Sequence, residues 1–285
     1  MKILITGAGG FIGTHLCRSL YKDYNVIGIV RTKNKQIALE KECKVKTYEA
    51  DLSKTFEIDD RIDIIIHAAA RSLNSGIPIK NYIYDNIIST QNLIDFAIRK
   101  KVELFINLSA ISVFGLIVSD VVDEETPIVN PSPYGMSKYM GELLLKQKED
   151  KLISVSFRMP VVVGNEMKNG WLFNTYKKIN NSERITIYNP NSPYNMIHVS
   201  DIYRLVKSCI NIGLSGSNLF TVTCKDLLSI KEIVTTMKKN IRSESPIEVK
   251  TSDEVGFTIS NKRIKEILNY KPQQAQYIIN SFLNK

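Results

Sequence analysis

The first thirteen residues constrain the fold of this chain more than any other stretch. They read MKILITGAGGFIG, in which residues 3–5 form an apolar run typical of a buried strand and residues 11–20 carry apolar side chains at helical spacing. Glycines stand at the turn between the two. Gly7 allows a tight turn, Gly10 lets the backbone approach a diphosphate, and Gly13 lets the helix pack close to the strand. The stretch predicts a strand, a turn and a helix whose N-terminal amides bind phosphate oxygens.

The following segments alternate short apolar runs with helix-like stretches, a pattern typical of βαβ units. Further strands are expected at 25–30, 45–48, 63–67, 104–108 and 153–157, and later helices at 172–180, 201–211, 230–240 and 262–268. Right-handed crossovers between the strands give an α/β fold with a Rossmann-type, doubly wound parallel sheet. We assign residues 1–164 to this dinucleotide-binding domain. Residues 165–285 are assigned to a smaller α/β substrate-binding lobe that interleaves with it.

Composition narrows the class of protein. The chain has 285 residues, 44% of them hydrophobic, and a net charge of +9. Its lysines are spread along helices and loops rather than gathered in a stripe, which argues against nucleic acid and suits anionic ligands. We expect no signal peptide, no membrane-spanning helix and no metal site. The four cysteines (Cys17, Cys43, Cys209, Cys224) lack metal-ligand spacing and are expected to be reduced thiols in the cytoplasm.

The end of the second expected strand bears on cofactor choice. Sheets that bind NAD usually place Asp or Glu there, to accept a hydrogen bond from the ribose 2′-hydroxyl. This chain has Arg31, followed closely by Lys33 and Lys35. A guanidinium cannot accept that hydrogen bond, but it can clamp a 2′-phosphate. We therefore favour NADP(H) over NAD(H), the alternative being that Arg31 only stacks on adenine.

The strongest chemical signal is the segment SPYGMSK at residues 132–138. Ser132 suits an N-cap and Pro133 the first helical position. Tyr134 and Lys138, four residues apart, then share one face of a helix. An ammonium close to a phenol favours the phenolate and is expected to lower its pKa toward the range useful for proton transfer.

Together these stretches resemble the extended short-chain dehydrogenase/reductase family, of the NAD-dependent epimerase/dehydratase kind, whose members mostly act on nucleotide sugars. The resemblance covers nearly the whole chain. It implies that Tyr134 and Lys138 are the catalytic pair and that Lys138 also holds the nicotinamide ribose. Asp51 would receive the adenine amino group or, with equal weight, form a turn. Further cofactor contacts implied by the resemblance are Phe11, Ile12, Leu52, Ala68, Ala69 and Val161.

The third member of that family's catalytic triad is a Ser or Thr at the end of the fifth strand. Here the pattern anchored on Val113-Phe114-Gly115 puts Ala110 at that position, which is a departure from the family. Ser109 would serve only if the loop slips by one residue, and Ser112 lies toward the substrate. Both hydroxyls are also explained as strand-end groups that bond to the backbone.

These features support three hypotheses about function. The first is an NADP(H)-dependent oxidoreductase that reduces a 4-keto group on a nucleotide-activated deoxysugar, with Tyr134 as general acid. The alternative is an NAD-dependent nucleotide-sugar 4-epimerase. Dehydration falls behind, because no Asp-Glu pair follows Ser109. The third, a redox sensor that binds NADP without turnover, gains support from Ala110. The resemblance also implies a homodimer seam formed by helices near 78–99 and 133–147.

Overall fold

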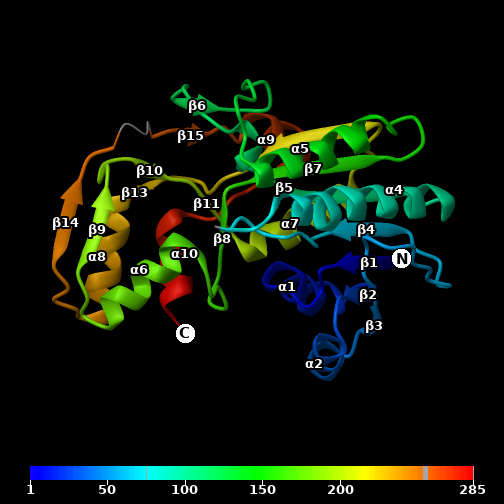
Figure 1. Ribbon diagram of the computed structural model, residues 1–285, viewed down its shortest axis with the longest axis horizontal. Helices are drawn as coiled ribbons and strands as arrows, with labels where there is room; N and C mark the ends of the chain where they lie inside the picture. Colours follow the sequence, from blue (N-terminus) through cyan, green and yellow to red (C-terminus); the bar gives the residue numbers. More distant parts are fainter. Residues whose placement is uncertain (75, 253–255, 285) are drawn as a thin grey trace.

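The computed structural model describes residues 1–74, 76–252 and 256–284, and its centre is a seven-stranded sheet (Figure 1). Its strands are β1 (Lys2–Thr6), β2 (Asn25–Val30), β3 (Lys46–Glu49), β4 (Ile64–His67), β5 (Leu104–Ala110), β7 (Ser154–Met159) and β12 (Ser217–Thr221). They follow the order β12-β7-β5-β4-β1-β2-β3, and each neighbouring pair is parallel. The strand order reverses between β1 and β4, where sheets of this kind bind ligands. The predicted doubly wound parallel sheet is confirmed.

Alternation along β1 explains the two layers of helices. Ile3 and Ile5 face one hydrophobic core and Leu4 faces the other. The first layer contains α1 (Phe11–Leu20), α2 (Lys33–Cys43), α7 (Val199–Asn211) and α9 (Lys262–Leu268). The second contains α4 (Ser89–Arg99) and α5 (Pro133–Lys146), with α3 (Ile79–Tyr82) and the π-helix η1 (Ile83–Ile88) leading into α4. The chain therefore buries both faces of the sheet, as parallel sheets require.

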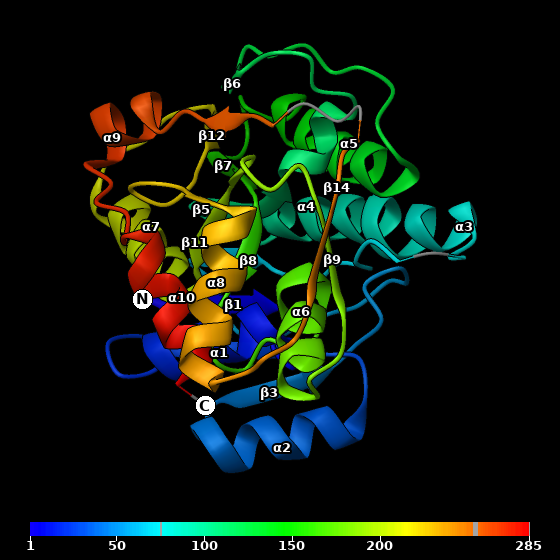
Figure 2. The same cartoon turned by 90° about the vertical axis from the view of Figure 1, so that its left-hand side faces the viewer.

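A separate hydrophobic core lies beyond the sheet, on the side that faces the viewer in Figure 2. Its helices are α6 (Gly170–Asn180), α8 (Ile230–Ile241) and α10 (Ala275–Leu283). Short strands pair around it as β8 (Val161–Val163) with β11 (Met196–His198), β9 (Ile185–Tyr188) with β14 (Ile247–Lys250), and β10 (Pro193–Tyr194) with β13 (Leu228–Ser229). Helix α8 begins with a capping box between Ser229 and Glu232, which satisfies its first amides. Among the described residues, this core adds to the two cores that flank the central sheet.

Residues before and after position 164 pair with each other in more than one place. Strand β12, which was not expected from the sequence, follows residue 164 and pairs with β7 at the edge of the central sheet. Strand β6 (Val121–Val122), which precedes residue 164, likewise pairs with β15 (Thr258–Ile259), which follows it. The division at residue 164 stays a prediction. Within the described residues, no helix has both the length and the apolar content needed to span a bilayer.

Candidate active site

The glycine-rich turn after β1 packs its backbone closely against the segment after β4 and against the start of α1. Gly7 has a φ of +65°, and a Cβ there would lie 2.7 Å from the backbone nitrogen of Ala69. A Cβ on Gly13 would overlap the carbonyl of Gly7. Gly10 precedes α1, and no side chain caps this helix, so its first amides stay available to an anion. The cradle fits the diphosphate of a dinucleotide.

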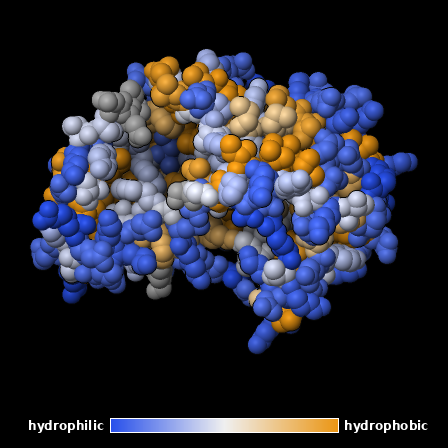
Figure 3. Space-filling view, viewed as in Figure 1, coloured by the Kyte–Doolittle hydropathy of each residue, from blue (hydrophilic) through white to orange (hydrophobic). Residues whose placement is uncertain are grey.

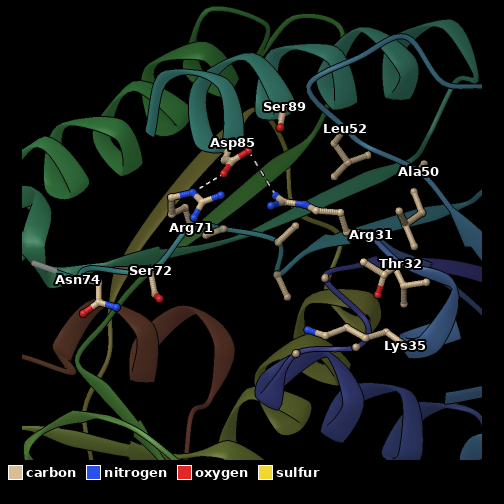
Figure 4. A pocket seen from close by; sticks show the side chains of 18 of the residues that line it. Arg31, Thr32, Lys35, Ala50, Leu52, Arg71, Ser72, Asn74, Asp85 and Ser89 are labelled. Atoms are coloured by element: carbon tan, nitrogen blue, oxygen red, sulfur yellow. Dashed lines mark hydrogen bonds and ion pairs between the residues drawn. The ribbon is translucent and has the colours of Figure 1, made fainter. Parts of the chain in front are cut away.

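A cavity of about 430 Å³ opens beside this turn, at the carboxyl ends of β1, β2, β3 and β4 (Figure 4). The predicted cofactor residues that line it are Gly7, Gly10, Arg31, Leu52, Ala68 and Ala69. Phe11 lines an adjoining cavity that shares Gly9 and Gly10. Ile12, Gly13, Asp51, Lys138 and Val161 are not lining residues of this first cavity. Six residues predicted from scattered stretches of sequence therefore meet in one space.

Asp51 forms a turn in the structure. One of its carboxylate oxygens accepts hydrogen bonds from the backbone nitrogen of Ser53, at 3.1 Å, and from its hydroxyl, at 2.8 Å. These bonds, with smaller contributions from Arg31 and Lys54, lower the pKa of Asp51. The turn-forming alternative is thus observed, and contact with adenine stays a prediction.

Among the lining residues of the cavity that the sequence reasoning missed, two are charged. Asp85, on η1, pairs with Arg31 at 3.4 Å and also with Arg71, which follows β4 (Figure 4). Arg71 carried a signal, because it lies just after a strand at the ligand-binding edge of the sheet. Asp85 carried none, since only folding brings residue 85 to the end of β2.

Helix α5 carries the predicted catalytic pair. The Ser132 hydroxyl accepts a hydrogen bond from Gly135 N, and Pro133 opens the helix as predicted. Lys138 is buried, with 5% of its surface exposed, and the Tyr134 ring lies 6.1 Å from that of Tyr82. Lys138 therefore faces the protein interior, while Tyr134 is half-buried.

A hydrogen-bond chain fixes the first turn of α5 against η1. Asn86 Nδ2 donates to the Ser137 hydroxyl at 2.8 Å, and this hydroxyl donates to the Tyr134 carbonyl at 2.7 Å. Asn86 also bonds to both backbone groups of Arg71. The backbone that carries Tyr134 is thereby tied to the segment that lines the dinucleotide cavity.

Burial governs the titration of both catalytic candidates. It lowers the pKa of Lys138 to about 8, although nearby Glu142 acts in the opposite direction. Burial also raises the pKa of Tyr134 to about 12, and Tyr82 adds to this effect. The prediction of a lowered pKa for Tyr134 is wrong, because loss of solvation dominates. Tyr134 is a neutral phenol at physiological pH, ready to donate a proton.

The serines near the end of β5 have different surroundings. The buried Ser109 hydroxyl donates to Glu142 Oε1 at 2.5 Å, and Glu142 is paired with buried Arg158 at 2.8 Å. Ser112 lies in the 3-10 turn η2 (Ile111–Phe114), with its carbonyl against Gly135 of α5. These contacts give Ser109 a structural partner and lend no support to a slipped loop. A catalytic role for either serine stays a prediction.

Ala110 ends β5, where it is half-buried and pairs with Met159. Val161, the predicted nicotinamide contact, lies just beyond in β8 and pairs with Met196. His67, which ends β4, is fully enclosed between the hydroxyls of Thr6 at 2.8 Å and Thr90 at 2.9 Å. Burial and Lys138 lower the pKa of His67 to about 3, so the ring stays neutral, as a structural histidine would.

A second, separate cavity of about 300 Å³ lies beside the core formed by α6, α8 and α10. Its aromatic members include Trp171 and Tyr194, whose rings are 5.0 Å apart, and Tyr188 from β9. Asn189 and Ser192 add polar groups. The space offers flat apolar surfaces with a polar edge, the combination that binds planar heterocycles.

Known proteins match both the sequence and the fold. A model of the NAD dependent epimerase/dehydratase family matches residues 3–212. An uncharacterized UDP-glucose epimerase, YtcB, from Bacillus subtilis is 36% identical over 183 residues, which are 57% of this chain and 55% of that protein. A UDP-glucose 4-epimerase from Lactobacillus helveticus is 29% identical over 156 residues, or 51% of this chain and 46% of the relative. The matched regions thus span about half of these two relatives.

Solved structures extend the likeness of the fold to the full chain. The UDP-glucuronic acid 4-epimerase of Bacillus cereus, in complex with NAD, superposes with a TM-score of 0.86 at 23% identity, covering 100% of this chain and 97% of its own. The UDP-Glc/GlcNAc 4-epimerase of Campylobacter jejuni gives 0.82 at 23% identity, with 99% and 98% covered. At such identity the likeness concerns the fold alone. Because the family model spans well over half of the chain, from the glycine-rich turn through the Tyr134–Lys138 helix, the chain belongs to the NAD-dependent epimerase/dehydratase family, within the extended short-chain dehydrogenase/reductases that its sequence resembles.

Proposed function

We propose that this chain is an NAD-dependent nucleotide-sugar 4-epimerase. The observation that carries the proposal is the position of Tyr134 and Lys138 on the buried face of α5, in a chain of this family with a dinucleotide cradle. Relatives and structural neighbours named as 4-epimerases support it. This replaces the 4-keto reductase as the leading hypothesis.

In this proposal NAD supplies a hydride acceptor that can return the hydride to the opposite face of the sugar carbon. The chain's own residues would bind it through the amides of α1 and the cavity at the ends of β1, β2 and β4. Lys138 would donate hydrogen bonds to the nicotinamide ribose. Tyr134, a neutral phenol in the protein without cofactor, would first lose its proton, since the positive charges of Lys138 and of bound NAD favour the phenolate. The phenolate would then accept the proton of the sugar O4 hydroxyl on oxidation and return it on reduction. Lys138 is buried and Tyr134 is half-buried, which limits the access of water to this exchange.

NAD rather than NADP is the cofactor we propose. Neighbouring structures contain NAD, and the Arg31 guanidinium is engaged by Asp85. The preference for NADP(H) inferred from Arg31 alone therefore loses its main support. The second cavity, with Trp171, Tyr188 and Tyr194, is proposed to hold the nucleotide base of the substrate.

A 4-keto reductase remains the second candidate, because the same Tyr134–Lys138 pair serves a one-way hydride transfer and Arg31 still offers a cation. A non-catalytic sensor is less consistent with a buried Lys138 four residues after a Tyr134 whose backbone is tethered by Ser137. A 4,6-dehydratase would need an acid–base pair after Ser109, where this chain has Ala110 and Ile111.

One experiment separates these candidates. Purified protein is incubated with NAD and, in turn, UDP-glucose, UDP-galactose and UDP-glucuronic acid, and products are resolved by NMR. A 4-epimerase yields the C4 epimer without net loss of NAD. A reductase instead consumes NADPH or NADH with nucleotide 4-ketosugars. Binding of cofactor without conversion of either set would favour the sensor, and the Tyr134→Phe protein serves as the inactive control.

A homodimer is proposed as well. Exposed apolar side chains occur on α3 and η1 (Ile79, Ile83, Tyr84, Ile88) and on α5 (Met136, Leu143). These are the two helical regions that the sequence predicts to form a dimer seam. A cytoplasmic location is also proposed, resting on four buried cysteines that are free thiols.

A further inference from the structure

The residue that follows β2, Arg31, is unexpected in an NAD-dependent family, and the ion pairs around the first cavity explain it. The chain places Arg31 where NAD-binding sheets place an acidic residue, yet the family and its neighbours are NAD-dependent. A free guanidinium at this position would attract a 2′-phosphate. In the structure it is not free, because its Nη2 lies 3.4 Å from Asp85 Oδ1.

We infer that Asp85 is the residue that selects NAD over NADP in this chain, by holding Arg31 and by supplying from η1 the negative charge that the end of β2 lacks. The inference rests on the proposed use of NAD. Asp85 lines the same cavity as Arg31 and the phosphate-binding glycines, and its carboxylate contacts the guanidinium that directly follows β2, the strand whose end recognises the ribose 2′ group in sheets of this kind.

The position of Asp85 is built into the fold rather than left to a mobile surface side chain. Only 14% of its side chain is exposed, and Arg71 binds its second oxygen. Arg71 is fixed in turn through its backbone by the neighbouring Asn86, at 2.7 Å and 3.1 Å. Asp85 and Asn86, which are consecutive residues of the π-helix η1, therefore both hold the segment that follows β4. A π-helix is an irregularity that is often found at functional sites.

Charge explains the consequence for selectivity. Arg31 and Arg71 share one carboxylate, so the three groups carry a single net positive charge. A 2′-phosphate would have to displace Asp85 from Arg31 and would then lie close to an uncompensated carboxylate. A ribose hydroxyl has no such cost and can donate to a carboxylate. Removal of the Asp85 charge should free Arg31 to bind a phosphate.

The test measures affinities for NAD and NADP by calorimetry, without any sugar. The wild type is expected to bind NAD more tightly. In Asp85→Asn, the affinity ratio of NADP to NAD is expected to rise at least about tenfold, the scale of one charged hydrogen bond. In Arg31→Gln/Asp85→Asn this gain should disappear. Asp95→Asn on α4 removes an equal charge from a carboxylate bonded to Gln91 outside the cavity, and should leave the ratio unchanged.

An unchanged ratio in Asp85→Asn, or an equal gain in Asp95→Asn, overturns the inference. So does a wild-type preference for NADP, which needs no variant and remains decisive if Asp85→Asn fails to fold. Failure of the proposed epimerase function would be seen separately, as tight and selective NAD binding without conversion of nucleotide sugars.

Discussion

At the scale of single residues, β5 ends in Ser109, which carries a hydroxyl, and Ala110, which does not. Ser109 has its hydroxyl bound to Glu142, inside a buried network with Arg158, while Ala110 stands where the family resembled has its catalytic Ser or Thr. In the proposed mechanism the proton donor that remains is Tyr134. In that mechanism, polarisation of the sugar carbonyl would therefore depend on fewer groups than in the family pattern.

Tyr134→Phe is expected to lower kcat by roughly 10²–10⁴, the usual worth of a general acid or base. The change removes one oxygen and keeps the ring that packs near Tyr82. Melting temperature and NAD affinity should therefore barely change, and steady-state kinetics on the nucleotide sugar that is converted provides the measurement. A variant with wild-type turnover would show that Tyr134 moves no proton.

Ser109→Ala is expected to affect stability more than turnover. It removes a donor from the buried Glu142 carboxylate, at a cost of about 1–3 kcal/mol in the free energy of unfolding. Urea titrations and kcat measured on the same samples separate the two effects. Ala110→Ser should leave kcat unchanged or raise it. A loss near 100-fold in the kcat of Ser109→Ala, the scale of one oxyanion donor, would restore Ser109 as the catalytic hydroxyl.

At the scale of elements, α5 carries Tyr134, Lys138 and Glu142 at successive four-residue steps, so one helix face holds the acid, the cation and a carboxylate. Burial of this face governs the protonation of Lys138. Strand β4 ends in His67, a second buried side chain that can take up a proton. We expect titration of Lys138 on α5 to matter at alkaline pH and titration of His67 on β4 to matter at acidic pH.

Cofactor affinity is expected to fall as pH rises through about 8. The folded pKa of Lys138 is lowered to about 8, so above that value the side chain loses the charge with which it would hold the cofactor. Affinities for NAD are measured between pH 6 and 10 in the wild type and in Lys138→Met. The variant should bind more weakly and lack this alkaline limb; the same limb in both proteins would assign it to another group.

Acid is expected to destabilise the fold through His67. Its folded pKa of about 3 lies below the unfolded value of 6.5, so the unfolded chain binds the proton first and stability falls as pH drops below 6.5. At pH 5 the loss is about 2 kcal/mol relative to pH 7.5. Urea unfolding of the wild type and His67→Gln at both values measures it. His198, whose pKa burial lowers to about 4, should add its own share in both proteins. An equal pH dependence in both would exclude His67.

At the scale of the whole molecule, hydrophilic residues cover much of the face in Figure 3, while apolar residues gather in its upper part, over β6 and α5. Exposed members include Val121 on β6 and Met136 and Leu143 on α5. Exposed apolar residues gathered on one part of a surface mark contacts with other proteins. Together with the exposed isoleucines of α3 and η1, α5 is the surface we assign to a second copy of the chain.

Size-exclusion chromatography with light scattering is expected to give a dimer for the wild type. Leu143→Glu and Ile83→Glu should yield monomers, because each places a charge in the proposed seam. Val249→Glu, at an exposed apolar position of β14, is the matched control and should remain dimeric. A monomeric wild type, or dimers in all three variants, would rule out this seam.

The sequence by itself determined the parallel sheet, the phosphate-binding turn and the Tyr134–Lys138 helix. These follow from local patterns: apolar runs bounded by glycines, a serine–proline helix start, and side chains four residues apart. Strand β2, for example, has the bounds expected for it. Local periodicity did not reveal β12, because Ser217–Thr221 has only two apolar residues and only its last two residues are buried.

Only the tertiary structure decided the surroundings of the functional groups. Arg31 alone predicts NADP, but the fold brings Asp85 to it from a helix that is distant in sequence. Lys138 alone predicts a lowered pKa for Tyr134, but burial of the whole helix face raises it. Ser109 alone is a candidate catalyst, until Glu142 and Arg158 enclose it. Charge pairing and desolvation depend on distances across the fold, and no local spacing encodes them.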